Sequence, residues 1–285
     1  MTTPVPSPAA SPVPVPVSAL TPTSALAQRI EVDGRPATAE TLLWPALVQT
    51  GHFTAMQVRG GKVRGLGLHL ARLDAATREL FGHGVDGEHV RGLVRHILRD
   101  DISDASVRVY VHAPGGQPSH LVTVRPPMEL PATMEGRAQS LRSVAYQLPF
   151  AHIKHLGGFA QARHAELARD DGFDEVLLTG PGGEVSEGAV TNIAFFDGTE
   201  VVWPDAPHLA GITMQLVRSR LPAAGLPTRH APVTLADLPS YRAAFVTNAW
   251  GVRPVRRIDD VAYGVDEQLM ARVAGAYEDV AWDTV

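Results

Sequence analysis

The order of helix-like and strand-like segments constrains the fold of this chain more than any other feature of its sequence. Apolar residues recur at helical spacing, and a further helix is expected after the glycines at 157 and 158. The expected helices cover residues 69–81, 90–98, 158–171, 212–221 and a C-terminal segment from about 265. The strand patterns lie at residues 30–32, 53–59, 62–65, 107–111, 120–124, 144–147, 175–179, 191–196, 200–203 and 243–247. Because strands and helices do not alternate regularly, we expect an α+β fold rather than a doubly wound sheet.

The length of 285 residues suits one large or two ordinary domains. Prolines at positions 126, 127 and 131 interrupt the regular patterns near the middle of the chain. We therefore expect a linker at residues 127–133. It would join a small N-terminal domain, residues 29–126, to a larger C-terminal domain, residues 134–285.

Residues 1–28 differ in composition from the rest of the chain. Seven prolines fall between Pro4 and Pro22, aromatic residues are lacking, and Arg29 is the first charged side chain. Such a segment favours extended polyproline-type conformations and cannot bury enough surface to fold, so a disordered tail is predicted. A signal peptide is the alternative, but it would need a basic start and an apolar run without prolines. The expected location is the cytoplasm.

Composition narrows the possible functions. The formal net charge is −5, and no block of five like charges occurs, so neither a nucleic acid nor a membrane surface is an expected partner. The chain has no cysteine, which excludes disulfides, a thiolate zinc site and a cysteine nucleophile. No stretch approaches the 18 apolar residues that a membrane span needs.

Lys154 is the most informative single residue. It is one of two lysines, whereas 23 of the 25 basic residues are arginine, and it lies in the apolar run Ala151-His152-Ile153-Lys154-His155-Leu156. A lysine amine can lose its proton and form an imine with a carbonyl, which a guanidinium cannot. A chance surface lysine in an arginine-rich chain is the alternative interpretation.

Other candidate residues are ambiguous when each is considered alone. Glu187 precedes a glycine and could be either a catalytic acid or a solvated turn residue. Gly211-Ile212-Thr213 stands at an expected helix start, where free N–H groups bind phosphate, although Thr213 could simply cap the helix. Arg72 lies off the apolar face of its expected helix and is typical of a surface arginine.

Five motifs resemble, in order and spacing, those of the fold-type IV pyridoxal-phosphate (PLP) enzymes, also called class IV aminotransferases. They are His-Leu-Ala-Arg-Leu at 69–73, Ile-Lys-His-Leu at 153–156, Val-Ser-Glu-Gly-Ala-Val-Thr-Asn at 185–192, Leu-Ala-Gly-Ile-Thr at 209–213 and Thr-Asn-Ala-Trp-Gly-Val-Arg-Pro-Val at 247–255. The resemblance runs from about residue 30 to the end. It implies a two-domain fold in which the larger domain is barrel-like, as in D-amino-acid aminotransferase.

The resemblance also implies roles for the candidate residues. Lys154 would carry the internal aldimine, a Schiff base with PLP, and would move the substrate Cα proton. Glu187 would pair with the pyridine nitrogen and keep it protonated. Three groups would hold the cofactor phosphate, and Asn248 lies where many relatives place a further phosphate ligand. Those three groups are the Arg72 side chain and the N–H groups of Ile212 and Thr213.

A different set of residues bears on the substrate. Arg108, Tyr110 and His112 alternate with valines, so a strand would present all three on one face. A solvent-facing edge is the alternative, but the resemblance places this strand at the substrate pocket, with Arg108 as the candidate for a substrate carboxylate. Ala249 and Trp250 replace part of the turn that receives a carboxylate in many transaminases.

Two further departures affect the expected substrate. Phe159 stands where several relatives have a tyrosine, and Phe53-Thr54 replaces a common Phe-Glu pair. The motifs are nearest to aminodeoxychorismate lyase and to the R-selective amine and D-amino-acid transaminases. His152 and His155 flank Lys154, but two histidines without nearby acids do not predict a metal site.

The predicted function is transfer of an amino group between an amino acid or amine and a keto acid. Aminodeoxychorismate lyase activity, which releases 4-aminobenzoate, is one alternative, and a degenerate homologue that binds PLP without turnover is another. The resemblance implies a homodimer. The turn-rich segment 113–118 is expected to be an exposed loop whose tip could reach a neighbouring pocket.

Overall fold

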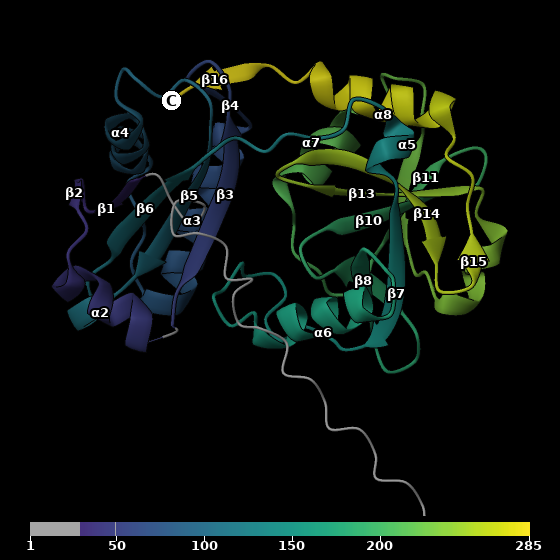
Figure 1. Ribbon diagram of the computed structural model, residues 1–285, viewed down its shortest axis with the longest axis horizontal. Coiled ribbons are helices and arrows are strands. Elements are labelled where there is room, and N and C mark those ends of the chain that lie inside the picture. Colours follow the sequence, from purple (N-terminus) through teal and green to yellow (C-terminus); the bar gives the residue numbers. More distant parts are fainter. Residues whose placement is uncertain (1–28, 49) are drawn as a thin grey trace, which may run out of the picture.

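The computed structural model describes residues 29–48 and 50–285. The predicted disordered tail, residues 1–28, lies outside the described residues. Two sheets of different construction stand beside each other along the longest axis of the molecule (Figure 1). The first sheet is formed by residues from the N-terminal part of the chain, and the second begins after the proline-rich segment near residue 130.

The first sheet has five strands in the order β2-β1-β6-β5-β3, and every neighbouring pair is antiparallel. The strands are β1 (Arg29–Val32), β2 (Arg35–Pro36), β3 (His52–Val58), β5 (Ala105–His112) and β6 (Ser119–Arg125). Buried and part-exposed side chains alternate along β3 and β5, so each strand has one face in the core. Helices α3 (Leu66–Phe81) and α4 (Gly87–Leu98) supply the other half of this core.

The second sheet closes into a barrel. Its ring order is β10-β13-β14-β7-β8-β9, and β9 pairs again with β10 through Asn192 and Glu187. The ring strands are β7 (Gln139–Ala145), β8 (Glu175–Thr179), β9 (Val185–Gly188), β10 (Asn192–Phe196), β13 (Ala243–Asn248) and β14 (Gly251–Ile258). Strands β11 (Val201–Pro204) and β12 (Thr228–Ala231) extend the sheet from β10, and β15 (Val261–Ala262) pairs with β14. The predicted α+β fold with a barrel-like larger part is confirmed.

Helices α6 (Phe159–Asp170), α7 (Ile212–Arg220) and α8 (Glu267–Glu278) pack around the barrel (Figure 1). Apolar residues of α7 and α8 form one core with the outward-facing residues of β10 and β13, whereas the barrel interior holds a second core. Two short helical segments flank the barrel strands: α5 (Met134–Arg137) and the 3₁₀ turn η3 (Leu235–Ser240). Within the described ranges, no helix combines the length and apolarity needed to cross a membrane.

The end of the chain returns to the first sheet. Strand β16 (Trp282–Thr284) pairs with β4 (Lys62–Arg64), and Val285 is buried in the core of the five-stranded sheet. Arg95 donates a hydrogen bond to the carbonyl of Val285 at 3.0 Å. The last residues of the predicted larger domain therefore pack against the smaller one, and the domain boundaries drawn from the sequence stay a prediction.

Helix α2 (Ala39–Leu47) has no counterpart in the sequence pattern. Its boundary is set by a capping box between Thr38 and Thr41, and none of its residues is buried. Because α2 has no apolar stripe that faces the core, its sequence lacks the helical spacing of apolar residues. The segment 113–118 contains the 3₁₀ turn η2 (Pro114–Gly116), and its residues 114–117 are exposed.

Candidate active site

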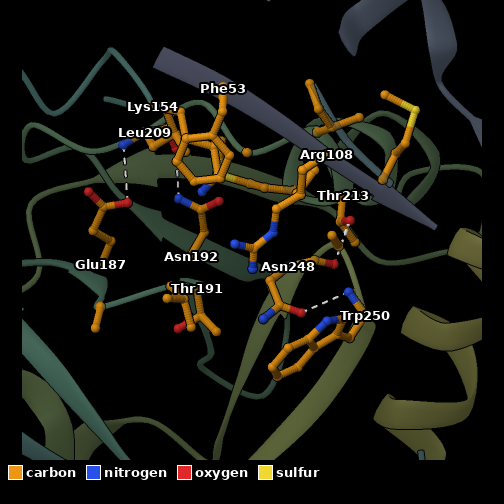
Figure 2. Close-up of a pocket in the computed structure, with 18 of the residues that line it drawn as sticks. Phe53, Arg108, Lys154, Glu187, Thr191, Asn192, Leu209, Thr213, Asn248 and Trp250 are labelled. Carbon is orange, nitrogen blue, oxygen red and sulfur yellow. Dashed lines mark hydrogen bonds between the residues drawn. The ribbon is translucent and has the colours of Figure 1, made fainter. Parts of the chain in front are cut away.

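A cavity of about 840 Å³ lies between the first sheet and the barrel. Strands β3 and β5 and helix α3 line it from one side. The loop that carries Lys154, the β9–β10 turn, the start of α7 and the end of β13 line it from the other. Because each side supplies only part of the lining, the cavity exists only when the two sheets are held together. Figure 2 shows ten of the lining residues with labels.

Lys154 lies in the loop between β7 and α6, and backbone hydrogen bonds attach this loop to β3. The Phe53 N–H donates to the Lys154 carbonyl at 2.9 Å, and the Leu156 N–H donates to the Gly51 carbonyl at 3.1 Å. The Lys154 Nζ lies 4.9 Å from the centroid of the Phe53 ring. Burial, assisted by the positive charge of Arg72, lowers the pKa of Lys154 to about 8. A minor fraction of this amine, far larger than for a solvated lysine, is therefore unprotonated near neutral pH.

Glu187 lies on β9 and is 5 % exposed, unlike a solvated turn residue. Its Oε2 accepts a hydrogen bond from the Leu209 N–H at 3.1 Å, and Asn192 Nδ2 donates to the Leu209 carbonyl at 2.7 Å (Figure 2). Its Oε1 is buried and has no hydrogen-bond partner among the residues described. Burial raises the pKa of Glu187 to about 7. An unpaired carboxylate oxygen of this kind can receive a proton from a bound molecule.

Arg72 lines the cavity from α3 instead of projecting into solvent. Burial lowers its pKa to about 10. Its Nη2 donates a hydrogen bond to Thr54 Oγ1, its Nε is buried without a partner, and within residues 29–48 and 50–285 no carboxylate forms an ion pair with it. A buried guanidinium without a counter-ion is costly unless an anion binds beside it.

The N-terminus of α7 faces the same cavity. Gly211 is the N-cap, so Thr213 is inside the helix rather than capping it. The Thr213 hydroxyl donates to the Asn248 carbonyl at 2.7 Å, which fastens the start of α7 to the end of β13. Ile212 and Thr213 belong to the first helical turn, whose N–H groups have no intrahelical acceptor. The helix dipole and these N–H groups together favour an anion at this point.

Four of the five residues predicted to contact the substrate line the cavity. Arg108 and Tyr110 do so from β5, and Ala249 and Trp250 do so from the β13–β14 turn. The Tyr110 ring stacks on Phe53 with centroids 5.3 Å apart, and Arg108 Nη1 donates to the Tyr110 hydroxyl at 3.3 Å. Asn248 accepts the Trp250 N–H at 2.9 Å through its Oδ1, which fixes this turn.

His112 differs from the other residues on its strand face. It is 3 % exposed and is not among the residues that line the cavity. At the end of β5 it packs against Gly51, where an added Cβ would lie 2.8 Å from His112 Nδ1. The two-residue period of a strand predicts on which face a side chain lies. At His112, the last residue of β5, packing against Gly51 keeps the side chain out of the cavity.

The sequence analysis assigned no role to His69, Asn192 or Leu209, and it noted Thr54 only as a departure from a common Phe-Glu pair. Asn192 and Leu209 act together, because the Asn192 side chain holds the Leu209 backbone whose N–H reaches Glu187. Asn192 ends the motif at 185–192 and Leu209 begins the motif at 209–213, and these positions were the only sequence evidence that the two residues belong to the site. Among the described residues, no group of three or more His, Asp or Glu side chains could hold a metal ion.

Solved structures share this architecture. A branched-chain aminotransferase from Thermoproteus uzoniensis is 21 % identical over 88 % of this chain and 94 % of its own, with a TM-score of 0.77. A hypothetical aminotransferase from Mycobacterium tuberculosis in its PLP-bound form is 19 % identical over 87 % and 98 %, with a TM-score of 0.75. A 4-amino-4-deoxychorismate lyase from Pseudomonas aeruginosa is 25 % identical over 88 % and 99 %, with a TM-score of 0.74.

Among curated protein sequences, none matches this chain at a significant level. The sequence profile of the family described as amino-transferase class IV matches residues 51–258. This range extends from the start of β3 to the end of β14, and so includes the lining of the cavity from both sheets. The chain therefore belongs to the class IV aminotransferase family.

Proposed function

We propose that this enzyme transfers an amino group between an amino acid or amine and a keto acid, with Lys154 as the catalytic residue. The observation that carries the proposal is the combination of Lys154 and Glu187 in one cavity. Burial moves both of their pKa values towards neutrality, to about 8 and about 7. Groups tuned in this way are typical of acid–base catalysis.

The cofactor of class IV aminotransferases is PLP. The residues of the cavity fit it, because three polar features lack partners that PLP would provide. The buried Oε1 of Glu187 would meet the ring nitrogen, whereas Arg72, with its unpaired Nε, and the first turn of α7 would hold the phosphate. Lys154 would bind the cofactor covalently, and Asn248 would lie beside the phosphate. When bound, PLP supplies an electron sink for carbanion chemistry.

The residues of this chain have separate tasks in such a reaction. The Lys154 amine can accept and return a proton near neutral pH because burial lowers its pKa. The Glu187 side chain can hold a proton in the same cavity because burial raises its pKa, and the Leu209 N–H holds the carboxylate in position. Arg108 and Tyr110 offer a cation and a hydroxyl to a substrate carboxylate. Trp250 and Phe53 supply apolar walls that limit access of water.

Aminodeoxychorismate lyase activity is the second candidate. The large Trp250 side chain at the cavity suits an aromatic substrate. The lyase from Pseudomonas aeruginosa also matches this chain over nearly its whole length. A homologue that binds PLP without turnover is the third candidate, and the presence of Lys154, Glu187 and Arg72 in one cavity argues against it.

One assay separates the candidates. Transamination consumes a keto acid acceptor, whereas the lyase needs none. The purified protein would be incubated with PLP and a panel of amines and amino acids, with and without pyruvate or 2-oxoglutarate. A second set of reactions would contain aminodeoxychorismate. Product that depends on the acceptor supports transamination, and release of 4-aminobenzoate without an acceptor supports the lyase. No product in either set would overturn both and favour the homologue without turnover.

The covalent link can be tested independently of turnover. Borohydride reduction after loading with PLP should leave the cofactor on Lys154, as located by peptide mapping. Lys62, the other lysine, is exposed on β4 and provides the internal control. An adduct on Lys62, or none at all, would show that the assignment of Lys154 is wrong.

A further inference from the structure

A buried threonine contacts Arg72 from behind the cavity wall, and a histidine that itself lines the cavity contacts this threonine. Along β3, Phe53 and Ala55 line the cavity, whereas Thr54 between them is fully buried and faces α3. Thr54 Oγ1 accepts a hydrogen bond from Arg72 Nη2 and lies 2.7 Å from His69 Nδ1. Thr54 is not part of the lining, so it can influence a bound molecule only through the lining residues that it contacts, Arg72 and His69.

The direction of each hydrogen bond in this group follows from its chemistry. A guanidinium can only donate, so Thr54 Oγ1 must accept from Arg72, and its own proton is left for His69 Nδ1. His69 can accept that proton only when neutral. Burial lowers its pKa to about 3, and the nearby charges of Arg72 and Lys154 act in the same direction. Donation therefore runs from Arg72 to Thr54 to His69.

This arrangement holds the arginine without neutralising it. The bond to Thr54 is the one hydrogen bond of the Arg72 side chain within the part of the chain that the structure describes. A carboxylate at position 54 would offset much of the positive charge of Arg72, whereas a hydroxyl leaves it available to an anion. An arginine that is held in one rotamer also loses less conformational freedom when an anion binds.

We propose that Thr54 and His69 are positioning residues that hold Arg72 ready for the phosphate of the cofactor. This inference rests on the proposed function, in which Arg72 binds that phosphate. Thr54 fixes the guanidinium, and His69 fixes the hydroxyl of Thr54. Thr54 is not expected to affect a ligand that lacks a phosphate. His69 itself lines the cavity, so its effect through Thr54 is expected as a change in the preference for PLP over such a ligand.

The chain offers a matched control for Thr54. Thr77 is also fully buried on the interface between α3 and β3, and its hydroxyl also contacts a buried histidine, His52 Nε2, at 2.9 Å. Thr77 has no hydrogen bond to Arg72; its hydroxyl donates to the Leu73 carbonyl at 2.7 Å. Thr54→Val and Thr77→Val therefore remove similar buried hydroxyls, and only the first one removes an acceptor of Arg72.

The experiment measures the Kd of PLP and of pyridoxal, which lacks the phosphate, on full-length protein freed of cofactor. We expect Thr54→Val to weaken PLP about tenfold and pyridoxal less than about twofold, as for the loss of one hydrogen bond to a charged group. Thr54→Ser should restore the affinity for PLP, and Thr77→Val should leave the ratio of the two Kd values unchanged. Equal weakening of both ligands, or no weakening of PLP, would overturn the proposal.

A pair of substitutions at His69 gives a second test that does not depend on how Thr54→Val folds. His69→Asn keeps an acceptor near the Nδ1 position, whereas His69→Leu removes it. Only His69→Leu should reduce the preference for PLP over pyridoxal. Equal loss of this preference in both variants, or no loss in His69→Leu, would remove His69 from the proposal.

Arg72→Met distinguishes failure of this inference from failure of the proposed function. If Arg72→Met leaves the preference for PLP over pyridoxal intact, Arg72 does not bind the phosphate, and the assignment on which the inference rests is wrong. If Arg72→Met removes that preference and Thr54→Val does not, the phosphate site stands and the positioning role is wrong.

Discussion

The pKa values of Glu187 and Lys154 are both shifted towards 7 by the same physical cause. Burial disfavours the charged form of each, which raises the pKa of the carboxyl to about 7 and lowers that of the amine to about 8. The attraction between the two opposite charges works against both shifts but does not cancel them. At the residue scale, the cavity therefore contains an acid and a base that can both change protonation state near neutral pH.

Glu187→Gln tests the role of the carboxylate in turnover. The amide should still hydrogen bond inside the cavity but cannot stabilise a positive charge on the cofactor ring. We expect PLP to remain bound, while the rate of proton abstraction falls roughly 10²-fold or more. Stopped-flow measurement of substrate deprotonation, with PLP occupancy measured in parallel, checks both parts. A variant that retains near-normal turnover would contradict the assigned role.

The same residue should make stability depend on pH. The pKa of Glu187 is raised from 4.5 to about 7, so between these values the folded protein binds more protons than the unfolded chain. The free energy of unfolding should therefore fall as pH rises through this window. Relative to Glu187→Gln, protein prepared without PLP should lose roughly 2–3 kcal/mol between pH 5 and 7.5.

Urea unfolding of wild type and variant at the two pH values measures that difference. Glu129→Gln, which removes an exposed carboxylate, is the control for the loss of one negative charge. If wild type and Glu187→Gln lose the same stability over this range, the raised pKa is contradicted.

At the scale of elements, the start of α7 is packed closely against β10. Gly211 has φ −62° and ψ 138°, which any residue can adopt, but an added Cβ would collide with Asn192 Oδ1. Asn192 could not move without releasing the Leu209 carbonyl, and with it the N–H that reaches Glu187. The glycine is therefore required by the close approach of two elements rather than by an unusual backbone conformation.

Gly211→Ala should lower the free energy of unfolding by about 1–3 kcal/mol, the usual cost of overpacking, and should weaken PLP binding. Gly275→Ala is the matched control. Gly275 lies inside α8, where an added Cβ meets no atom within 4 Å, so alanine should stabilise the helix by about 0.5–1 kcal/mol. Thermal and urea unfolding of both variants measure the two effects. Destabilisation by Gly275→Ala, or none by Gly211→Ala, would contradict the packing argument.

At the scale of the whole molecule, the site depends on how the two sheets are joined. The Lys154 loop is bonded to β3 of the first sheet, and β16 pairs with β4 in a separate two-stranded sheet, so segments from the barrel side are attached to the N-terminal part of the chain at two places. Asp283 also accepts the N–H of Leu66 at 2.9 Å, at the start of the helix that carries Arg72. The relative position of Lys154 and Arg72 is thus set by contacts between distant parts of the chain.

We predict a two-fold symmetric homodimer, the commonest closed assembly, with the exposed segment 113–118 near the pocket of the neighbouring subunit. Residues 1–25 should lie outside the interface. A protein that lacks them should therefore remain an active dimer, lighter only by the mass of the deleted residues. Light scattering and the aminotransferase assay test this. An active monomer, or dissociation of the dimer after the deletion, would show the prediction to be wrong.

The sequence by itself indicated many of the local elements and the chemical inventory, but not strands β9, β12, β14 and β16. Helical spacing located α3 and α4, the glycines at 157 and 158 marked the start of α6, and the five motifs indicated Lys154, Glu187, Arg72 and the start of α7. These patterns can be recognised without the tertiary structure, because helical and strand spacing relate residues that are close together in the sequence. Strand β7, by contrast, begins at Gln139, well before the predicted segment, and α2 was missed because it buries no residue.

Only the tertiary structure decided which residues meet. Strands β8, β9 and β10 follow one another in the chain, but the ring is complete only because β10 pairs with β13 and β14 pairs with β7, which come from distant parts of the chain. Thr54 meets Arg72 and His69 because β3 packs on α3, and His112 is not part of the cavity lining because it packs against Gly51. Periodicity predicts which face of a helix or strand is buried, but not which other element packs on that face. That choice depends on side chains that are far apart in the sequence and meet only in the folded protein.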